Sequence, residues 1–121
     1  MRKRVVILAS GTGSLTQAII DATELDIQVV AVVSDKADAQ VLERAKKAGI
    51  NTSTISLTGD RAAWDKQLFD QVDKYQPDLV ISAGFMKILS AEFVHYFPTI
   101  NSHPALLPEF PGAHAIRDAL A

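Results

Sequence analysis

Two polar side chains late in the sequence, Asn101 and His103, have types and a spacing suited to acyl transfer. If residues 99–103 are extended, both side chains point to one face, because side chains on a strand repeat every two residues. Pro104 biases His103 toward that extended backbone. A histidine with a near-neutral pKa can move protons, and an asparagine amide can stabilise a developing oxyanion. In the alternative interpretation, Asn101 satisfies backbone groups in a proline-rich loop and His103 is packed inside the fold.

A glycine-rich turn at residues 11–14 (Gly-Thr-Gly-Ser) separates an apolar run from a helical pattern and indicates an anion site. Unpaired backbone N–H groups and the positive end of a helix favour a phosphate there. The nucleoside-triphosphate loop sequence is absent, and Thr16 stands where the dinucleotide-binding pattern requires glycine or alanine. Asp35, after the next apolar run, fits either a ribose-binding role, as in nicotinamide enzymes, or a turn or cap role. A tight turn without a ligand is the alternative for residues 11–14.

The two remaining histidines carry weaker cases for chemistry. His95 falls on an amphipathic helical pattern, and His114 lies where a last helix would begin. No group of His, Asp and Glu has metal-ligand spacing, and the sequence contains no cysteine. The sequence therefore predicts no metal site.

Apolar runs along the chain predict the strands that would position these residues. The buried strands are expected at 5–9, 27–33 and 79–83, with a weaker Thr/Ser-rich strand at 50–57. Strands alternate with helical patterns, which predicts one Rossmann-like, doubly wound α/β domain over residues 1–121 with a mostly parallel sheet. Ligands bind at the carboxyl ends of such strands, so the candidate residues should share one rim of the sheet.

Apolar residues at helical spacing predict four helices between these strands. They are expected to begin beside Gly13, after Asp38, at residue 61 and at Ser90. Ser14 and Gln17 form a capping box, and Asp38 and Ser90 are predicted caps. Four of the five prolines lie between residues 98 and 111, which predicts a rigid loop over 97–112 before a further helix from 113.

Composition limits the classes of partner. The chain has 121 residues, 12 Lys and Arg, 14 Asp and Glu, and a net charge of −2. A balanced charge argues against general nucleic-acid or membrane-surface binding, which needs a basic face. No apolar stretch approaches the roughly 20 residues of a membrane helix. The absence of cysteine fits a reducing compartment, so a soluble cytoplasmic protein is expected.

Six segments of the sequence match one enzyme family. They are residues 6–14, 17–21, 34–38, 42–45, 83–89 and 101–108. Together they resemble the phosphoribosylglycinamide formyltransferases, the folate-dependent family that formylates glycinamide ribonucleotide in purine synthesis, and the likeness covers the whole chain. Related methionyl-tRNA formyltransferases usually have Arg-Gly where this chain has Phe-Pro-Gly at 110–112. Formyltetrahydrofolate deformylases usually have His-His where this chain has His103-Pro104.

The resemblance implies two small-molecule subsites. The phosphate of glycinamide ribonucleotide would be bound by residues 12–15, which are Thr12, Gly13, Ser14 and Leu15. The co-substrate 10-formyltetrahydrofolate would be bound by Arg61, Met86, Lys87, Ile88, Leu89 and Asn101. Two positions depart from the commonest pattern, since the family usually has Asn at Leu15 and Arg at Lys87. The family also tends to have a cis peptide at Leu107-Pro108.

The resemblance also implies a mechanism, in which the glycyl amine attacks the formyl carbon. His103 would move protons and Asn101 would donate a hydrogen bond to the tetrahedral intermediate. The family's third partner, an Asp, matches no residue here, and Asp118 is no substitute by motif. We therefore expect an N-terminal fragment that is inactive or feeble alone, and we leave open whether it forms a homodimer.

Two other functions stay open on the sequence alone. The first is a non-catalytic Rossmann-like module that binds a phosphate or a dinucleotide through Gly11, Gly13 and Asp35. The second is formyl transfer to an aminoacyl-tRNA, which the acidic net charge and the Phe-Pro-Gly at 110–112 disfavour.

Overall fold

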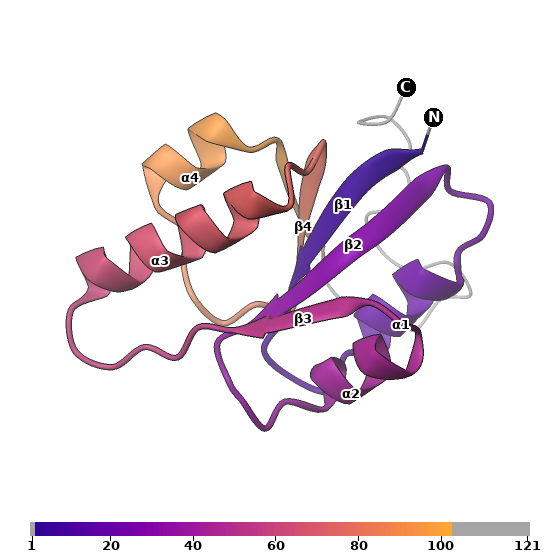
Figure 1. Ribbon diagram of the computed structural model, residues 1–121, viewed down its shortest axis with the longest axis horizontal. Helices are drawn as coiled ribbons and strands as arrows, with labels where there is room; N and C mark the ends of the chain where they lie inside the picture. The colour runs from indigo at the N-terminus through magenta and orange to yellow at the C-terminus, as the bar shows by residue number, and fades with distance from the viewer. Residues whose placement is uncertain (1, 103–121) are drawn as a thin grey trace.

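Strands and helices alternate along the computed structural model, which describes residues 2–102 (Figure 1). The strands are β1 (Lys3–Leu8), β2 (Ile27–Ser34), β3 (Asn51–Thr54), β4 (Leu79–Ala83) and β5 (Thr99–Ser102). The helices are α1 (Ser14–Asp21), α2 (Gln40–Lys47), α3 (Arg61–Lys74) and α4 (Ala91–Tyr96). The predicted Rossmann-like α/β fold is confirmed.

The five strands form one parallel sheet in the order β3-β2-β1-β4-β5. The apolar strand β1 lies at the centre, where Val5 pairs with Val29 of β2 and with Leu79 of β4. From β1 the chain adds β2 and β3 on one side and then β4 and β5 on the other. This reversal creates a crevice at the carboxyl ends of β1 and β4, where doubly wound sheets bind ligands.

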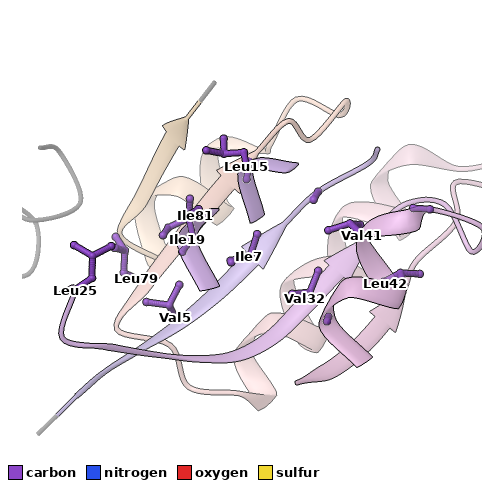
Figure 2. Packing of buried hydrophobic residues seen from close by; sticks show 14 residues of the cluster. Val5, Ile7, Leu15, Ile19, Leu25, Val32, Val41, Leu42, Leu79 and Ile81 are labelled. Atoms are coloured by element: carbon purple, nitrogen blue, oxygen red, sulfur yellow. The ribbon is translucent and has the colours of Figure 1, made fainter. Parts of the chain in front are cut away.

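Helices cover both faces of the sheet, α1 and α2 on one and α3 and α4 on the other (Figure 1). Val5 and Ile7 of β1 pack with α1 and α2, as Figure 2 shows, while Val6 and Leu8 pack with α3 and α4. Alternate side chains of one strand therefore enter two separate apolar clusters. Burial on both faces explains why the central strands are continuously apolar rather than alternating.

Two of the predicted helix caps are wrong. Gly13 is the N-cap of α1 and has a left-handed backbone conformation, and no side chain caps the helix. The predicted capping box does not form, because the Gln17 side chain donates to Asp21 Oδ1 (3.0 Å) instead of returning to the start of α1. Asp38 does not cap α2 either, since the N-cap of α2 is the next residue, an alanine without a polar side chain.

The third predicted cap, Ser90, is confirmed, and all four helices begin where they were expected. Ser90 Oγ accepts a hydrogen bond from Phe93 N–H (3.1 Å) and so begins α4. Asp60, in the turn before α3, also acts as a cap, because its Oδ1 accepts from Ala62 N–H (3.1 Å). Both caps supply an oxygen to a backbone donor that has no acceptor within its helix.

The predicted loop over 97–112 begins with a strand instead. Residues 99–102 form β5 because they pair in parallel with β4, with Ser82 opposite Asn101. The rest of the predicted loop, His103, the Leu107-Pro108 peptide and the helix expected from 113 lie outside the described residues. The Thr/Ser-rich strand is shorter than predicted, at residues 51–54.

Candidate functional site

The turn between β1 and α1 presents backbone donors at the carboxyl end of the sheet. Gln17 N–H is the first in α1 to bond to a carbonyl, that of Gly13 (2.8 Å), so the N–H groups of residues 14–16 have no acceptor within the helix. Gly13 has φ 84°, and a Cβ atom there would lie 2.6–2.8 Å from Val41 of α2. Only glycine combines this backbone angle with such a close approach to α2.

Two hydrogen bonds from helix α2 hold this turn in place. Val41 N–H donates to the Gly11 carbonyl (3.2 Å), and Arg44 Nε donates to the Thr12 carbonyl (2.7 Å). The side chains of Thr12 and Ser14 are exposed at the rim, but the side chain of Leu15 is buried in the core. Of the residues predicted to bind phosphate, Leu15 can therefore contribute only its backbone N–H group.

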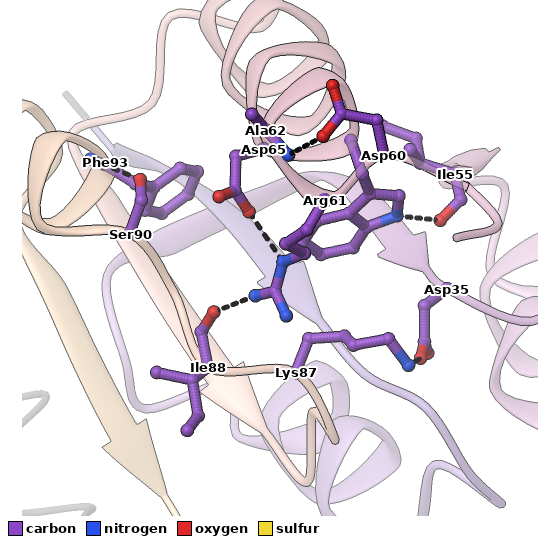
Figure 3. A network of polar contacts seen from close by, with 11 residues as sticks. Asp35, Ile55, Asp60, Arg61, Ala62, Asp65, Lys87, Ile88, Ser90 and Phe93 are labelled. Atoms are coloured by element: carbon purple, nitrogen blue, oxygen red, sulfur yellow. Dashed lines mark hydrogen bonds and ion pairs between the residues drawn. The ribbon is translucent and has the colours of Figure 1, made fainter. Parts of the chain in front are cut away.

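The loop that follows β4 carries most of the predicted folate residues, and three polar contacts hold it. Met86 N–H donates to Ser10 Oγ (2.8 Å), Lys87 Nζ contacts Asp35 Oδ2 (3.0 Å), and the Arg61 guanidinium donates to the Ile88 carbonyl. Figure 3 shows the last two contacts. The partners come from the ends of β1 and β2 and from the start of α3. The loop is therefore fixed to three separate elements through two backbone groups and one ammonium.

Arg61 is the first residue of α3, and two side chains of the same helix fix its position. Its Nε forms an ion pair with Asp65 Oδ1 (2.9 Å), and its guanidinium lies 4.8 Å from the centre of the Trp64 ring. The indole N–H of Trp64 donates to the Ile55 carbonyl (2.6 Å), and its ring stacks on Phe85. Arg61 and the loop at 86–89, which are far apart in the sequence, thus meet as the folate prediction requires.

Asp35 is the most deeply buried charged side chain of this region, with 1% of its side chain exposed. Burial raises the pKa of Asp35, but hydrogen bonding from Ser10 and the contact with the Lys87 ammonium outweigh it, so the pKa lies below the ordinary value. The carboxylate therefore stays charged and is engaged with Lys87. In this arrangement it offers nothing to a ribose, contrary to the nicotinamide-type alternative.

A groove of about 410 Å³ lies beside the loop at 86–89 and reaches β5. Apolar side chains on its wall are unusually open, since Met86 is 72% and Ile88 85% exposed. Asn101, exposed on β5, lines the same groove as Lys87 and Leu89. The hydrogen bonds to the loop backbone thus keep the apolar side chains of Met86 and Ile88 exposed in a groove that the Asn101 amide also lines. This arrangement suits a ligand with a flat apolar part and polar edges.

The structure brings the predicted residues together as two neighbouring groups. The loop at 86–89 and Asn101 line the groove, and Arg61 contacts that loop at the Ile88 carbonyl without lining the groove. Residues 12–15 form the turn one strand away. Ser10, which follows β1 after one residue, connects them through its bond to Met86. Sequence reasoning missed Ser10, whose only signal is its place after a buried strand. His103 directly follows β5 but lies outside the described residues.

Two general features of the described residues bear on the kind of protein. Within residues 2–102 no cluster of three or more His, Cys, Asp or Glu side chains is arranged to hold a metal ion. None of the helices in this part of the chain is both long and apolar enough to cross a membrane.

Comparison with known proteins points to one family. The sequence profile of the family described as formyl transferase matches residues 3–121. The chain is 49% identical to a phosphoribosylglycinamide formyltransferase of Escherichia coli (strain K12), over 96% of this chain and 58% of that relative. It is 45% identical to the enzyme of the same name from Mycobacterium tuberculosis (strain H37Rv), over 98% of this chain and 57% of that relative. The chain thus spans a little over half the length of these relatives.

Solved structures show the same similarity. A phosphoribosylglycinamide formyltransferase from Brucella melitensis superposes with a TM-score of 0.81 at 38% identity, over 99% of this chain and 66% of that one. A glycinamide ribonucleotide transformylase from Symbiobacterium toebii gives a TM-score of 0.80 at 38% identity, over 98% of this chain and 59% of that one.

Proposed function

Because this chain belongs to the formyl transferase family, we propose that it acts in formyl transfer from 10-formyltetrahydrofolate to the glycyl amine of glycinamide ribonucleotide, a step of purine synthesis. The names of the relatives support the acceptor and the transferred group, since they are phosphoribosylglycinamide formyltransferases at 49% and 45% identity. The folate donor follows from the resemblance to the folate-dependent family. Both proposed substrates are small molecules. The proposed compartment is the cytoplasm, which the absence of cysteine supports.

The turn between β1 and α1 is the proposed phosphate subsite. The unbonded N–H groups at the start of α1 and the exposed hydroxyls of Thr12 and Ser14 suit a phosphate dianion. Gly13 lets the backbone pass close to α2. Because the side chain of Leu15 is buried, this residue would bind the phosphate only through its backbone N–H group. Arg44, which bonds to the Thr12 carbonyl, adds positive charge beside the turn.

The groove beside β4 is the proposed folate subsite, and one observation carries this assignment. Met86 and Ile88 are held with 72% and 85% of their surface open although they are large apolar residues. Contact between this apolar surface and water is unfavourable in free energy, and an apolar ring of a ligand that covers the groove removes it. Arg61 holds the loop through the Ile88 carbonyl, and the Lys87 ammonium lies beside it for the polar edge of the ligand.

Asn101 is the proposed hydrogen-bond donor to the reacting carbonyl. Attack by the glycyl amine forms a bond to the formyl carbon and moves an electron pair onto the formyl oxygen. The Asn101 amide donates a hydrogen bond to that oxygen, and His103, two residues further on, takes a proton from the amine. Collapse of the intermediate breaks the bond to the folate nitrogen, which receives a proton as it leaves.

The competing function is a dinucleotide-binding module without acyl chemistry. It requires an exposed acidic side chain after β2 that can accept from ribose hydroxyls. Asp35 occupies that place, but its side chain is 1% exposed and bonded to Lys87. The buried ion pair therefore favours the folate assignment over a nicotinamide dinucleotide.

Calorimetric titration of a stable folate analogue, glycinamide ribonucleotide and a nicotinamide dinucleotide distinguishes these functions. We expect binding of the first two, and Ile88→Ser weakens folate affinity about tenfold because its apolar contact is lost. Leu57→Ser is the matched control, since Leu57 is also an exposed apolar residue but does not line the groove. Binding of the dinucleotide with no binding of folate or ribonucleotide overturns the proposal.

A further inference from the structure

The carboxyl ends of three neighbouring strands meet at one buried acid. Asp35 follows β2, Ser10 follows β1 after one residue, and Lys87 lies in the loop after β4. The Asp35–Lys87 pair is strongly asymmetric, because the carboxylate is 1% exposed and the ammonium side chain 25% exposed. The acid is therefore a fixed point of the fold, and the lysine is the partner that reaches toward it from a surface loop.

Ser10 connects the same acid to the backbone of that loop. Its Oγ accepts from Met86 N–H (2.8 Å), and Ser10 also favours the charged form of the Asp35 carboxylate, whose pKa it lowers. A hydroxyl that accepts one bond keeps its own hydrogen, so Ser10 can hold Met86 and still direct that hydrogen toward the carboxylate. Two successive loop residues, Met86 by its backbone and Lys87 by its side chain, thus depend on one carboxylate.

We infer that Asp35 is a positioning residue that orders the loop at 86–89 and thereby shapes the groove beside it. The inference rests on the proposed function only for the identity of the ligand. Asp35 itself is too buried to touch that ligand. It acts through Lys87 and through Ser10, which hold the loop in the position that keeps Met86 and Ile88 open toward the groove.

Removal of the charge should loosen the loop and spare the sheet. Asp35→Asn keeps the shape of the side chain, and Lys87, already 25% exposed, can turn into solvent when its partner is lost. The loop then keeps its Arg61 contact at Ile88 but loses the fixed position of Lys87. We expect folate affinity to fall about tenfold, the scale for loss of a partly exposed charged contact.

The test compares Asp35→Asn with Asp70→Asn, which removes the same charge from an exposed ion pair with Lys66 (3.7 Å). Amide hydrogen exchange at Met86 and the dissociation constant of a folate analogue are measured in both, at a temperature where each variant is folded. We expect faster exchange and about tenfold weaker binding in Asp35→Asn alone. A purely structural role would lower the free energy of unfolding without changing the affinity of the folded protein.

A second variant keeps the inference falsifiable if Asp35→Asn does not fold. Ser10→Ala leaves the Asp35–Lys87 pair in place but removes the acceptor of Met86 N–H, and it should shift both measurements in the same direction. Unchanged exchange at Met86 in the variants, or faster exchange with unchanged affinity, overturns the inference. If the unsubstituted protein binds no folate analogue, the proposed function fails, and exchange at Met86 still decides whether Asp35 orders the loop.

Discussion

Replacement of Gly13 by alanine is the most direct test of how the turn before α1 is built. Gly13 has φ 84°, and an added Cβ would lie 2.6 Å from Val41 Cγ2 and 2.8 Å from Val41 Cα. An L-residue in this conformation costs about 1 kcal/mol. The contact with Val41 adds about 1–3 kcal/mol, because part of it is with backbone that cannot rotate away. We expect Gly13→Ala to lower the free energy of unfolding by about 2–4 kcal/mol.

Gly49 provides a matched control for the two contributions. It has φ 74°, close to that of Gly13, but an added Cβ there has no atom within 4 Å. Gly49→Ala should therefore cost only the conformational part, about 1 kcal/mol. Urea denaturation of both variants measures the difference. If Gly13→Ala is no more destabilising than Gly49→Ala, the close approach of the turn to α2 does not restrict residue 13 and the reasoning is refuted.

Three further predictions concern the site. Arg61→Lys should weaken folate binding about tenfold by calorimetry, because an ammonium cannot reproduce the planar fork that bonds both Asp65 and the Ile88 carbonyl; unchanged affinity would contradict this. The pKa of Asp35 is lowered by folding, so its stabilisation is fully present above the ordinary value of 3.8 and is lost as pH falls through the lower folded value. Urea denaturation at a series of acid pH values should show that the free energy of unfolding falls more steeply with pH in the unsubstituted protein than in Asp35→Asn. Equal slopes would refute the lowered pKa of Asp35. In a chain completed to the length of its relatives, His103→Asn should abolish turnover and leave the affinity for the ribonucleotide phosphate unchanged; normal turnover in a formyl-transfer assay would remove His103 from its role.

Three strands, β1, β2 and β4, were predictable because each is buried on both faces of the sheet over most of its length. The apolar runs at 5–9, 27–33 and 79–83 predicted them without knowledge of their partners. The strand β5 was not predicted, because its four residues form a strand only by pairing with β4. The capping box predicted at Ser14 and Gln17 is wrong, because a left-handed glycine occupies the cap position and the Gln17 side-chain amide donates to Asp21 instead of accepting at the start of α1. Local capping patterns describe a preference that neighbouring contacts can override.

The sequence allowed the residues of the candidate site to be proposed but not the contacts that hold them together. Arg61 and the loop at 86–89 were both expected near the folate, yet their contact is with the Ile88 carbonyl, and a backbone atom leaves no signal in the sequence. The Asp35–Lys87 pair spans 52 positions, and its partners are brought together only by the order of the strands. Without knowledge of its partner Lys87, Asp35 therefore suggested a ribose-binding or capping role rather than a buried ion pair.

The central position of β1 has a consequence during synthesis. β1 leaves the ribosome first and can pair with β2 soon afterwards, but its other edge stays open until β4 appears. At roughly 5–20 residues per second, the roughly 50 residues between the ends of β2 and β4 take about 2–10 s to be made. Throughout that interval the nascent chain presents Val5–Leu8, a fully apolar strand with free backbone donors and acceptors, to other chains. The topology that forms the crevice thus also sets the period in which a chaperone would be of most use.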